Sequence, residues 1–401
     1  MKVNIVARPD HSLKMFEGLL RNKQCEDNVD LFTFYALRKG SFLNWLFPKL
    51  KAAPEQAITL DSYTLITRLS NMLVRMIGGN TRKNEVRLFK LLAPKNKIKE
   101  CDILHYWPFY CADMAGNFKA NRKIRTVAEY YEAEPLFVND IYDEEYKRFN
   151  IDCENKINLM IDQNKAFEFE NDFIVASEFT KRSYELRYPH KNYHVCKYGP
   201  AGYTLDDSLL SNSGNRCFSN AGRLVFVGQI CVEKGVHYLL EAIKGMDVTL
   251  DLIGSIRTGQ EKIFSELLQP LANVNQLGPM LHSEVLNSLS DYDAFCLPSL
   301  ADNYSLAVVE ALSKGKPVIV TENCGNADDV KDYHLGLVAK VKDAVSIRKC
   351  ILELKSSFDY AEFNAGVRRF FSEENCQAYP KSVLDVYKTI LERNNEDSIC
   401  N

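Results

Sequence analysis

One stretch of the chain places two acids around the start of a helix. Residues 298–319 leave an apolar strand, pass through a polar loop that holds Asp302, and enter a helix that carries Glu310. Gly315 ends this helix before the next apolar run. Helix N-termini favour anions, and the carboxyl ends of parallel strands carry the ligand sites of α/β folds. The stretch therefore predicts a sugar-nucleotide site.

The two acids are expected to act separately. Asp302 and Glu310 are eight residues apart with a helix start between them, so they need not share a face. Taken alone, Asp302 fits a helix cap and Glu310 an ordinary helix acid. Glu310, however, lies among apolar residues, where a carboxylate is costly to bury without a partner. This favours a bound hydroxyl or a buried ion pair for Glu310.

A second loop supplies a cation. A predicted strand ends at Gly228, which lets the backbone approach a ligand closely. Lys234 follows near the start of the next helix, where its ammonium group would neutralise a diphosphate. The alternative is an ordinary surface lysine, because a strand followed by glycine, loop and lysine is a common pattern.

The elements that position these residues alternate regularly in the second half of the chain. Apolar strand runs are predicted at Leu224–Val227, Val248–Ile253, Asn273–Gln276, Ala294–Leu297, Pro317–Val320 and Leu335–Val338. Helices are predicted at Gly235–Ile243, Glu261–Leu268, His282–Leu289, Leu306–Ser313 and Ala344–Leu354. This alternation predicts a parallel sheet with helices on both faces.

The first half is less regular but similar in kind. Its predicted strands are Val3–Val6, Leu31–Phe34, Ile103–His105, Ile124–Ala128, Phe173–Ala176 and His194–Lys197. Its predicted helices are Ser12–Arg21, Ser62–Met76 and Glu178–Arg187, and residues 37–80 are expected to contain an insertion. Turn residues near 205 separate the halves. We expect doubly wound domains at 1–204 and 205–375 with a cleft between them. A final helix, Cys376–Arg393, is predicted in the segment 376–401.

Composition fits a chain without a membrane span. Of 401 residues, 46% are apolar and 26% charged, with a net charge of -3. The apolar start is too short for a signal peptide and predicts a buried strand. Twelve cysteines show no C-x-x-C pair and no zinc spacing, which favours thiols in a reducing cytoplasm. No metal site and no nucleic-acid partner are expected.

Charge is unevenly distributed along the chain. Residues 1–120 hold 19 Lys+Arg against 11 Asp+Glu, a net of +8, so the remainder of the chain is net -11. One basic cluster at 38–51 includes Trp45 and Phe47, and a second runs through 82–99. Such segments can lie on an anionic membrane surface or grip a phosphorylated substrate. A solvated helix face is the alternative.

These motifs together carry a family resemblance. The second half resembles the retaining GT-B glycosyltransferases of family 4. The matching segments are Phe226-Val227-Gly228, Glu233-Lys234-Gly235, Leu252-Ile253-Gly254, Leu277-Gly278-Pro279, Pro298-Ser299 and the Asp302-x7-Glu310 pair with Ala311. The first half is more loosely similar, at Asp102–His105, Glu144–Tyr146, Ala176–Ser183 and Tyr198-Gly199. The segments recur in the family's order and spacing.

The resemblance implies a role for each residue. Glu310 would accept hydrogen bonds from the donor ribose, Asp302 would lie beside the transferred sugar, and Lys234 would stabilise the departing diphosphate. The remaining implied donor contacts are Gly228 and Gln229, the backbone of Ser305 and Leu306 at the diphosphate, and Gly278, Pro279, Met280 and Leu281 at the nucleobase. The last helix would cross back onto the first domain. Metal and cofactor are not required beyond the nucleoside diphosphate sugar itself.

Several positions depart from the family pattern. Asp302 replaces a glutamate, Ser305 a glycine, and Gln229 the diphosphate-binding arginine. The usual acceptor-side histidine is absent from 126–135, where Glu129, Glu132 or Glu134 would face the acceptor instead. His105 and Trp107 fit either an acceptor contact or the core. The family's glycine-rich loop after the first strand is missing, and residues 8–12, which contain no glycine, stand in its place.

The expected activity is therefore sugar transfer from a UDP- or GDP-sugar to a hydroxyl with retention of configuration. A glycan or lipid-linked acceptor in cell-surface polysaccharide or glycoconjugate synthesis is expected, in the cytoplasm or at the inner face of the membrane. Two alternatives remain open: a non-catalytic sugar-nucleotide-binding relative or partner subunit, and a GT-B sugar-nucleotide epimerase.

Overall fold

The structure is a computed structural model of the chain. It describes residues 1–7, 19, 28–33, 36–38, 51–53, 58–59, 61–76, 84–85, 87–88, 91, 98, 100–119, 124–151, 162–200, 202–211, 218 and 222–399. The clusters around Trp45 and Phe47, the 8–12 loop and nearly all of the predicted helix Ser12–Arg21 lie outside these residues, as does much of the 82–99 cluster.

The second half of the chain forms a six-stranded parallel sheet in the order β12-β11-β10-β13-β14-β15. Its strands are β10 (Gly222–Val227), β11 (Val248–Ile253), β12 (Val274–Gly278), β13 (Ala294–Leu297), β14 (Val318–Thr321) and β15 (Gly336–Ala339). The six predicted strands are therefore confirmed to within two residues. Because β11 and β12 extend from β10 in one direction and β13 to β15 in the other, the order reverses between β10 and β13.

Burial explains why these strands could be predicted. The β13 residues Ala294–Leu297 are all buried, as are Leu224, Val225 and Phe226 of β10. Continuous apolar runs are typical of parallel strands that are covered on both faces. The covering helices are α11 (Val236–Ile243), α12 (Glu261–Leu268), α13 (His282–Ser288), α14 (Leu306–Ser313), α15 (Ala327–Asp332), α16 (Ala344–Ser356) and α17 (Tyr360–Phe370). Helices α15 and α17 were not predicted.

The first half forms a seven-stranded parallel sheet in the order β5-β2-β1-β6-β7-β8-β9. Its strands are β1 (Lys2–Ala7), β2 (Asn28–Thr33), β5 (Ile58–Thr59), β6 (Ile103–Tyr106), β7 (Arg125–Tyr130), β8 (Asp172–Val175) and β9 (Asn192–Val195), and β3 (Ala36–Arg38) pairs with β4 (Lys51–Ala53) separately. The helical elements are α3 (Asp61–Met76), α6 (Pro108–Lys119), α7 (Pro135–Arg148), the 3-10 helix η1 (Asp162–Glu168) and α9 (Glu178–Glu185). Helices α6 and α7 were not predicted.

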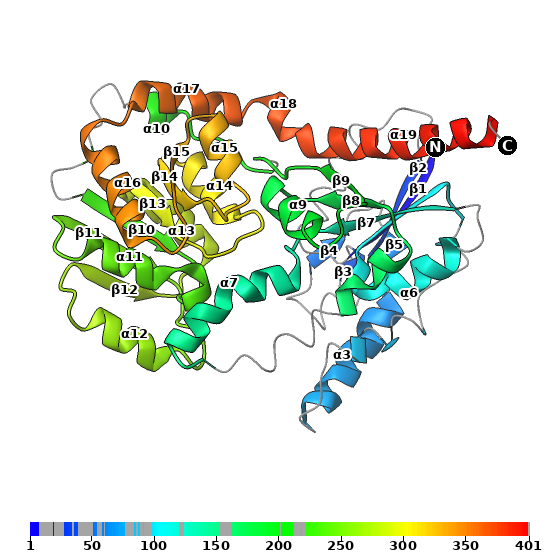
Figure 1. Cartoon of the computed structure of the whole chain (residues 1–401), viewed down its shortest axis with the longest axis horizontal. Coiled ribbons are helices and arrows are strands. Elements are labelled where there is room, and N and C mark those ends of the chain that lie inside the picture. Colours follow the sequence, from blue (N-terminus) through cyan, green and yellow to red (C-terminus); the bar gives the residue numbers. More distant parts are fainter. Residues whose placement is uncertain are drawn as a thin grey trace.

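The end of the chain returns to the first domain, as expected (Figure 1). After the short α18 (Glu373–Cys376), α19 (Ala378–Ile399) packs on the first sheet. Val383 and Tyr387 of α19 share one hydrophobic cluster with Val3, Leu31 and Ile103. The helix thereby supplies part of the core of a domain that begins at the other end of the chain.

Helix α7 lies between the two domains (Figure 1). It follows β7 of the first sheet, yet Ile141 and Tyr142 pack against the core of the second domain. The carboxyl edges of the sheets also meet: Asn303, after β13, accepts a hydrogen bond from the Ala133 backbone N–H at 2.7 Å and another, through its carbonyl, from the Ser177 hydroxyl at 2.9 Å. Two Rossmann-like domains that face each other with a returning C-terminal helix form the predicted GT-B arrangement.

Candidate active site

An ion pair lies where the strand order of the second sheet reverses. Lys234 ends the 3-10 helix η3 (Val232–Lys234) after β10, and Asp302 lies in the loop after β13. Their side chains meet at 2.5 Å between Nζ and Oδ2. The carboxyl edge at such a reversal is the usual ligand site of open α/β sheets. The structure thus brings together two predicted site residues that are 68 positions apart.

Close backbone packing holds these two loops together. Gly235 has φ +66°, and a Cβ atom there would lie 1.9 Å from the Pro298 carbonyl oxygen. The Leu300 N–H also donates to the Glu233 carbonyl at 3.0 Å. A side chain at 235 would be both strained and obstructed. The glycine after Lys234 is therefore required for the lysine to reach Asp302.

The environment keeps Lys234 charged. Burial by itself would lower the pKa of its ammonium group, but the charge and hydrogen bond of Asp302 outweigh burial and raise that pKa above its ordinary value. Asp302 is positioned by its own backbone, which accepts from the Gly325 N–H at 2.7 Å and donates to the Asn323 carbonyl at 3.0 Å. The pair is a fixed cation beside a fixed carboxylate.

A second cation reaches this edge from the neighbouring loop. Arg257 follows β11, and its Nε donates to the Gln229 side-chain oxygen at 2.8 Å. Its Nη1 also donates to the buried carboxylate of Glu233. The guanidinium therefore lies beside Gln229, the residue that stands where the resemblance implies an arginine. Arg257 was not among the predicted site residues.

Strand register is the signal that could have found Arg257. Val227 of β10 pairs with Ile253 of β11, so Gly228 and Gly254 leave adjacent strands at the same level. The Gly254 N–H donates to the Gly278 carbonyl, which extends the alignment to β12. Residues that follow aligned strand ends meet at one edge, and Arg257 is three positions past Gly254.

Glu310 lies in α14 with two partners. Its Oε1 accepts a hydrogen bond from the Tyr203 hydroxyl at 3.1 Å and contacts His282 Nε2 at 2.8 Å. The side chain of Glu310 is mostly buried, whereas that of His282 is 66% exposed. Burial, together with the charge and hydrogen bond of Glu310, raises the pKa of Tyr203. Glu310 therefore has two hydrogen-bonding partners from other parts of the chain, a tyrosine hydroxyl and a histidine ring.

The loop predicted to contact a nucleobase lies beside Glu310. Gly278 ends β12 with φ +73°, Pro279 and Met280 follow, and Leu281 precedes α13 with its side chain exposed. His282, the first residue of α13, links this loop to Glu310. An exposed leucine next to a buried acid provides an apolar surface and a hydroxyl acceptor within one region.

A backbone N–H group at the start of α14 already has a hydrogen-bond acceptor within the chain. The Ser305 N–H, which the resemblance assigns to a diphosphate, donates to the Asn326 side-chain oxygen at 2.6 Å. Leu306 then begins the helix and is half-buried. The site predictions for Ser305 and Leu306 stay predictions, and a ligand at the Ser305 N–H would have to displace Asn326.

Glu129 is enclosed at the end of β7. Its carboxylate accepts hydrogen bonds from the side chains of Trp107, at 3.2 Å, and Tyr198, at 3.4 Å, and from the Tyr379 hydroxyl at 3.1 and 3.2 Å. His105 Nε2 lies 3.0 Å from the same carboxylate. The side chain is 3% exposed, so its visible role is to hold α19 and the domain linker against the first sheet. A role toward an acceptor stays a prediction.

The other acceptor-side candidates differ in burial. Glu134 is buried and caps α7 by accepting from the Phe137 N–H at 2.7 Å. Glu132 is half-buried. Trp107 and His105 are both buried, which corresponds to the core alternative stated for them.

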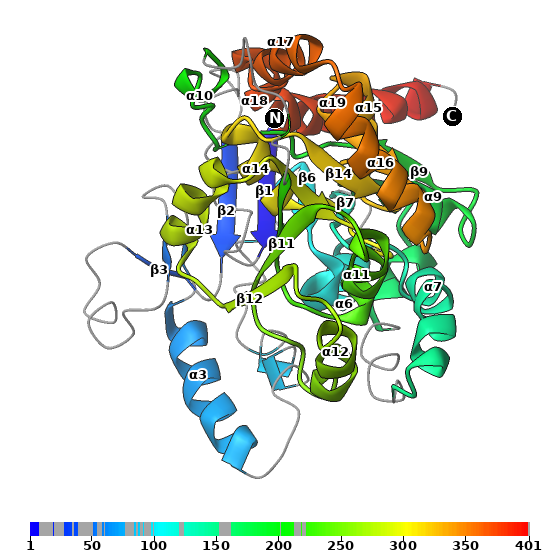
Figure 2. The same ribbon diagram turned by 90° about the vertical axis from the view of Figure 1, so that its left-hand side faces the viewer.

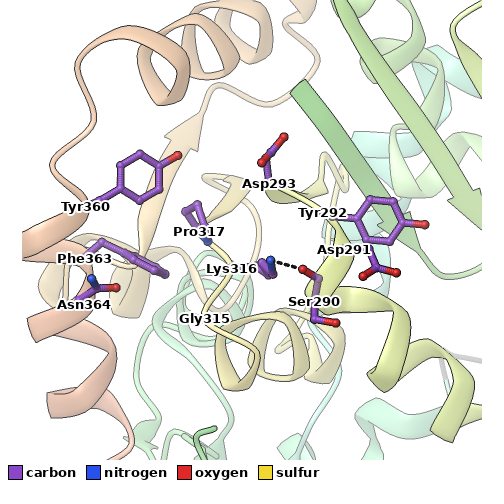
Figure 3. Close-up of a pocket in the computed structure, with 10 residues that line it drawn as sticks. All are labelled: Ser290, Asp291, Tyr292, Asp293, Gly315, Lys316, Pro317, Tyr360, Phe363 and Asn364. Carbon is purple, nitrogen blue, oxygen red and sulfur yellow. Dashed lines mark hydrogen bonds between the residues drawn. The ribbon is translucent and has the colours of Figure 1, made fainter. Parts of the chain in front are cut away.

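A separate pocket lies at the opposite edge of the second sheet (Figure 3). It is formed where β13 and β14 begin, between the 290–293 loop, the 315–317 loop and α17. The buried Lys316 lies in it and donates to the Ser290 carbonyl at 2.6 Å. The pocket shares no lining residue with the Lys234–Asp302 region.

Comparison with known protein families finds one family model that matches the chain within its second domain. Residues 215–362 match the family model described as glycosyl transferases group 1. The capsular polysaccharide biosynthesis glycosyltransferase CapM of Staphylococcus aureus is 24% identical over 196 residues, which cover 47% of this chain and 52% of that protein. The chain spans about half the length of the curated relatives it matches.

Solved structures resemble the whole chain in fold. Sucrose-phosphate synthase from Thermosynechococcus elongatus superposes with a TM-score of 0.64 at 15% identity, over 98% of this chain and 100% of that one. Anabaena Alr3699/HepE in complex with UDP-glucose gives a TM-score of 0.54 at 15% identity, over 99% and 100%. These similarities show the GT-B fold.

Proposed function

We propose that this protein is a glycosyltransferase that moves a sugar from a nucleoside diphosphate sugar to an acceptor hydroxyl with retention of configuration. The observation that carries the proposal is the Lys234–Asp302 pair at the order reversal of the second sheet, opposite the loops of the first domain. The matched region 215–362 contains both residues. The donor proposed is a UDP- or GDP-sugar, by analogy with the UDP-glucose bound to HepE.

Each part of a donor has a counterpart at this edge. Lys234 and Arg257 neutralise the diphosphate, and Asp302 lies beside the transferred sugar. Glu310 accepts from the ribose hydroxyls after His282 moves aside, and Leu281 supports the base. Because Lys234 and Arg257 supply two positive charges, we expect the reaction to need no metal ion.

The reaction breaks the bond between the anomeric carbon and the diphosphate oxygen. Negative charge develops on the departing diphosphate, and fixed cations stabilise such charge most when water is excluded. The acceptor oxygen bonds to the anomeric carbon, and its proton passes to the diphosphate. A glycan or lipid-linked acceptor is proposed, because CapM acts in capsular polysaccharide biosynthesis.

A donor screen followed by turnover tests the proposal. UDP-, GDP- and ADP-sugars are compared by thermal shift, since a ligand that binds the folded protein raises its melting temperature. With the best donor, Lys234→Ala is expected to lower kcat about 100-fold to 1,000-fold, the usual effect of removing one charge-stabilising group. Glu310→Ala is expected to abolish turnover. Lys342→Ala is the matched control, because Lys342 pairs with Glu144 away from the donor groups.

The outcomes separate the alternatives. Binding without hydrolysis or transfer would indicate a non-catalytic sugar-nucleotide-binding protein. An altered sugar detected by NMR without any acceptor would indicate an epimerase. Near-wild-type turnover in both Lys234→Ala and Glu310→Ala would refute the site.

A further inference from the structure

Helix α3 presents an apolar stripe to solvent. The side chains of Ile66, Leu69, Met72, Leu73 and Met76 are between 41% and 78% exposed. At about 100° per residue, these five positions fall within an arc of roughly 120° on one side of the helix. Both views show α3 projecting from the body of the first domain (Figures 1 and 2). The stripe is therefore a continuous outer surface.

The opposite side of α3 is polar and buried. Thr67 is fully buried and Asn71 is 8% exposed. Asn71 donates to the Glu85 carboxylate at 2.7 Å and accepts from the Asn84 amide at 2.8 Å, while Asn84 also donates to the Ser70 hydroxyl at 3.0 Å. A helix on a water-facing surface normally has the reverse arrangement. Helix α3 has this arrangement inverted, with its polar side buried and its apolar side exposed.

Charge selects between the occupants that could cover such a stripe. Residues 61–99 contain nine Lys+Arg and two Asp+Glu, and α3 itself has Arg68 and Arg75 but no acid after Asp61. A second copy of the chain would bring the same basic segment against itself, and like charges brought together oppose association. An anionic lipid surface attracts basic segments and accepts apolar side chains.

We propose that α3 lies in the interface of an anionic bilayer, with its apolar stripe among the acyl chains. Among the helices that the structure describes, none has the length and hydropathy of a membrane span. Helix α3 begins directly after β5, at the carboxyl edge of the first sheet. Docking through α3 therefore brings that edge to the lipid surface. The proposal is independent of the sugar-transfer reaction.

Vesicle binding tests the proposal with the full chain. The protein is sedimented with phosphatidylcholine vesicles and with vesicles in which phosphatidylglycerol replaces part of the phosphatidylcholine. Binding is expected only to the anionic vesicles and to weaken as salt screens the basic segment. The triple variant Leu69→Gln/Leu73→Gln/Met76→Gln is expected to bind at least roughly tenfold less, because it removes most of the stripe.

A matched variant controls for exposed apolar residues in general. Val345 and Leu352 of α16 are also exposed, at 77% and 49%, but belong to the second domain. Val345→Gln/Leu352→Gln is expected to bind vesicles as the wild type does. Circular dichroism and melting of the triple variant are expected to match the wild type, since the buried side of α3 is unchanged.

Two results would overturn the proposal. One is equal binding of the wild type and the triple variant to anionic vesicles. The other is a wild-type dimer in light scattering that the triple variant converts to a monomer while neither binds lipid, which would assign the stripe to a second copy. Donor turnover is measured in parallel, and its presence or absence does not bear on the lipid result.

Discussion

At the scale of single residues, the cations of the candidate donor site are held by acids before a ligand arrives. Lys234 contacts Asp302, and Arg257 contacts Glu233. A buried acid left without partners is costly. Glu233 keeps hydrogen bonds from the Tyr146 hydroxyl at 2.6 Å and the Gln260 amide at 3.1 Å when Arg257 turns away. The arginine can therefore transfer to a phosphate while Glu233 stays satisfied.

Arg257 is expected to replace the arginine that is absent at position 229. Arg257→Gln should weaken binding of a nucleoside diphosphate about 10-fold to 100-fold, because a hydrogen bond to a charged group contributes about 1.5–3 kcal/mol. The exchange variant Gln229→Arg/Arg257→Gln should recover much of the affinity, since it restores a guanidinium on the adjacent strand end. Calorimetry with UDP and GDP measures both effects.

The control for this exchange is Arg348→Gln. Arg348 donates to the Ala242 and Lys244 carbonyls, away from the Gln229 region, so its loss should not change nucleotide affinity. If Arg257→Gln binds as tightly as the wild type, Arg257 serves only to pair Glu233.

The position of a residue in the fold could be predicted where the evidence was local. Lys234 and Asp302 each follow a recognisable strand end, and the structure places both at the same edge of the sheet. The partners of Glu310 could not be predicted in the same way, because Tyr203 and His282 are 107 and 28 positions away and come from a linker and another helix. An apolar neighbourhood indicates that an acid needs a partner, but it does not name the partner.

At the scale of elements, α7 shows what a local pattern cannot reveal. Strands β11 and β13 were predicted with their observed bounds because their own domain buries nearly all of their residues. Helix α7 instead packs the partly buried Tyr142 against the other domain and buries Glu145. From its neighbours in the sequence, an acid such as Glu145 would be expected to face solvent. Its burial follows from partners on α11 that only the folded structure brings near.

Those partners make Glu145 an acid-sensitive contact between the domains. Its carboxylate accepts from the Tyr238 hydroxyl and contacts His237 Nε2 at 3.2 Å. Burial alone would raise the pKa of Glu145, but the hydrogen bonds from His237 and Tyr238 lower it from 4.5 to about 2. A depressed pKa stabilises the folded state above pH 4.5, and this stability is lost as the pH falls toward 2.

Glu145→Gln is therefore expected to destabilise the protein in a pH-dependent way. At pH 7 the loss should be about 1.5–3 kcal/mol, the usual contribution of hydrogen bonds to a buried charge. The difference from the wild type should shrink as the pH falls from 4.5 toward 2, because in this range the unfolded wild type binds a proton at Glu145 that the folded protein does not. Urea midpoints at a series of pH values measure this difference.

The neighbouring residue provides the control. Glu144 is 78% exposed and pairs with Lys342, so Glu144→Gln should change the midpoint little at any pH. If Glu145→Gln lowers the urea midpoint equally at neutral and acidic pH, the loss of stability comes from packing and not from the charge.

At the scale of the whole molecule, the two ends of the chain form one core. Tyr379 and Tyr387 of α19 are buried with Val3 of β1 in a single cluster. The Tyr387 hydroxyl lies 2.7 Å from His105 Nδ1, and Tyr379 donates to Glu129. The first domain can therefore complete its core only after the last helix has been made.

Tyr379→Phe is expected to loosen the first domain selectively. It removes two hydroxyl contacts from the buried Glu129 carboxylate, at a cost of about 1–3 kcal/mol. Amide hydrogen exchange should rise in β1, β6 and β7, whereas β10 and β13 should stay protected, because local stability follows the contacts that each unit makes. Mass spectrometry of peptides from both sheets measures the difference.

A tyrosine outside this cluster provides the comparison. Tyr333 of the second domain contacts Asn375 through its hydroxyl at 3.2 Å, and Tyr333→Phe should leave exchange in the first sheet unchanged. If Tyr379→Phe instead raises exchange in β10 and β13, then α19 stabilises the second domain from which it emerges. Faster exchange confined to the first sheet would mean that the first domain depends on the end of the chain for its stability.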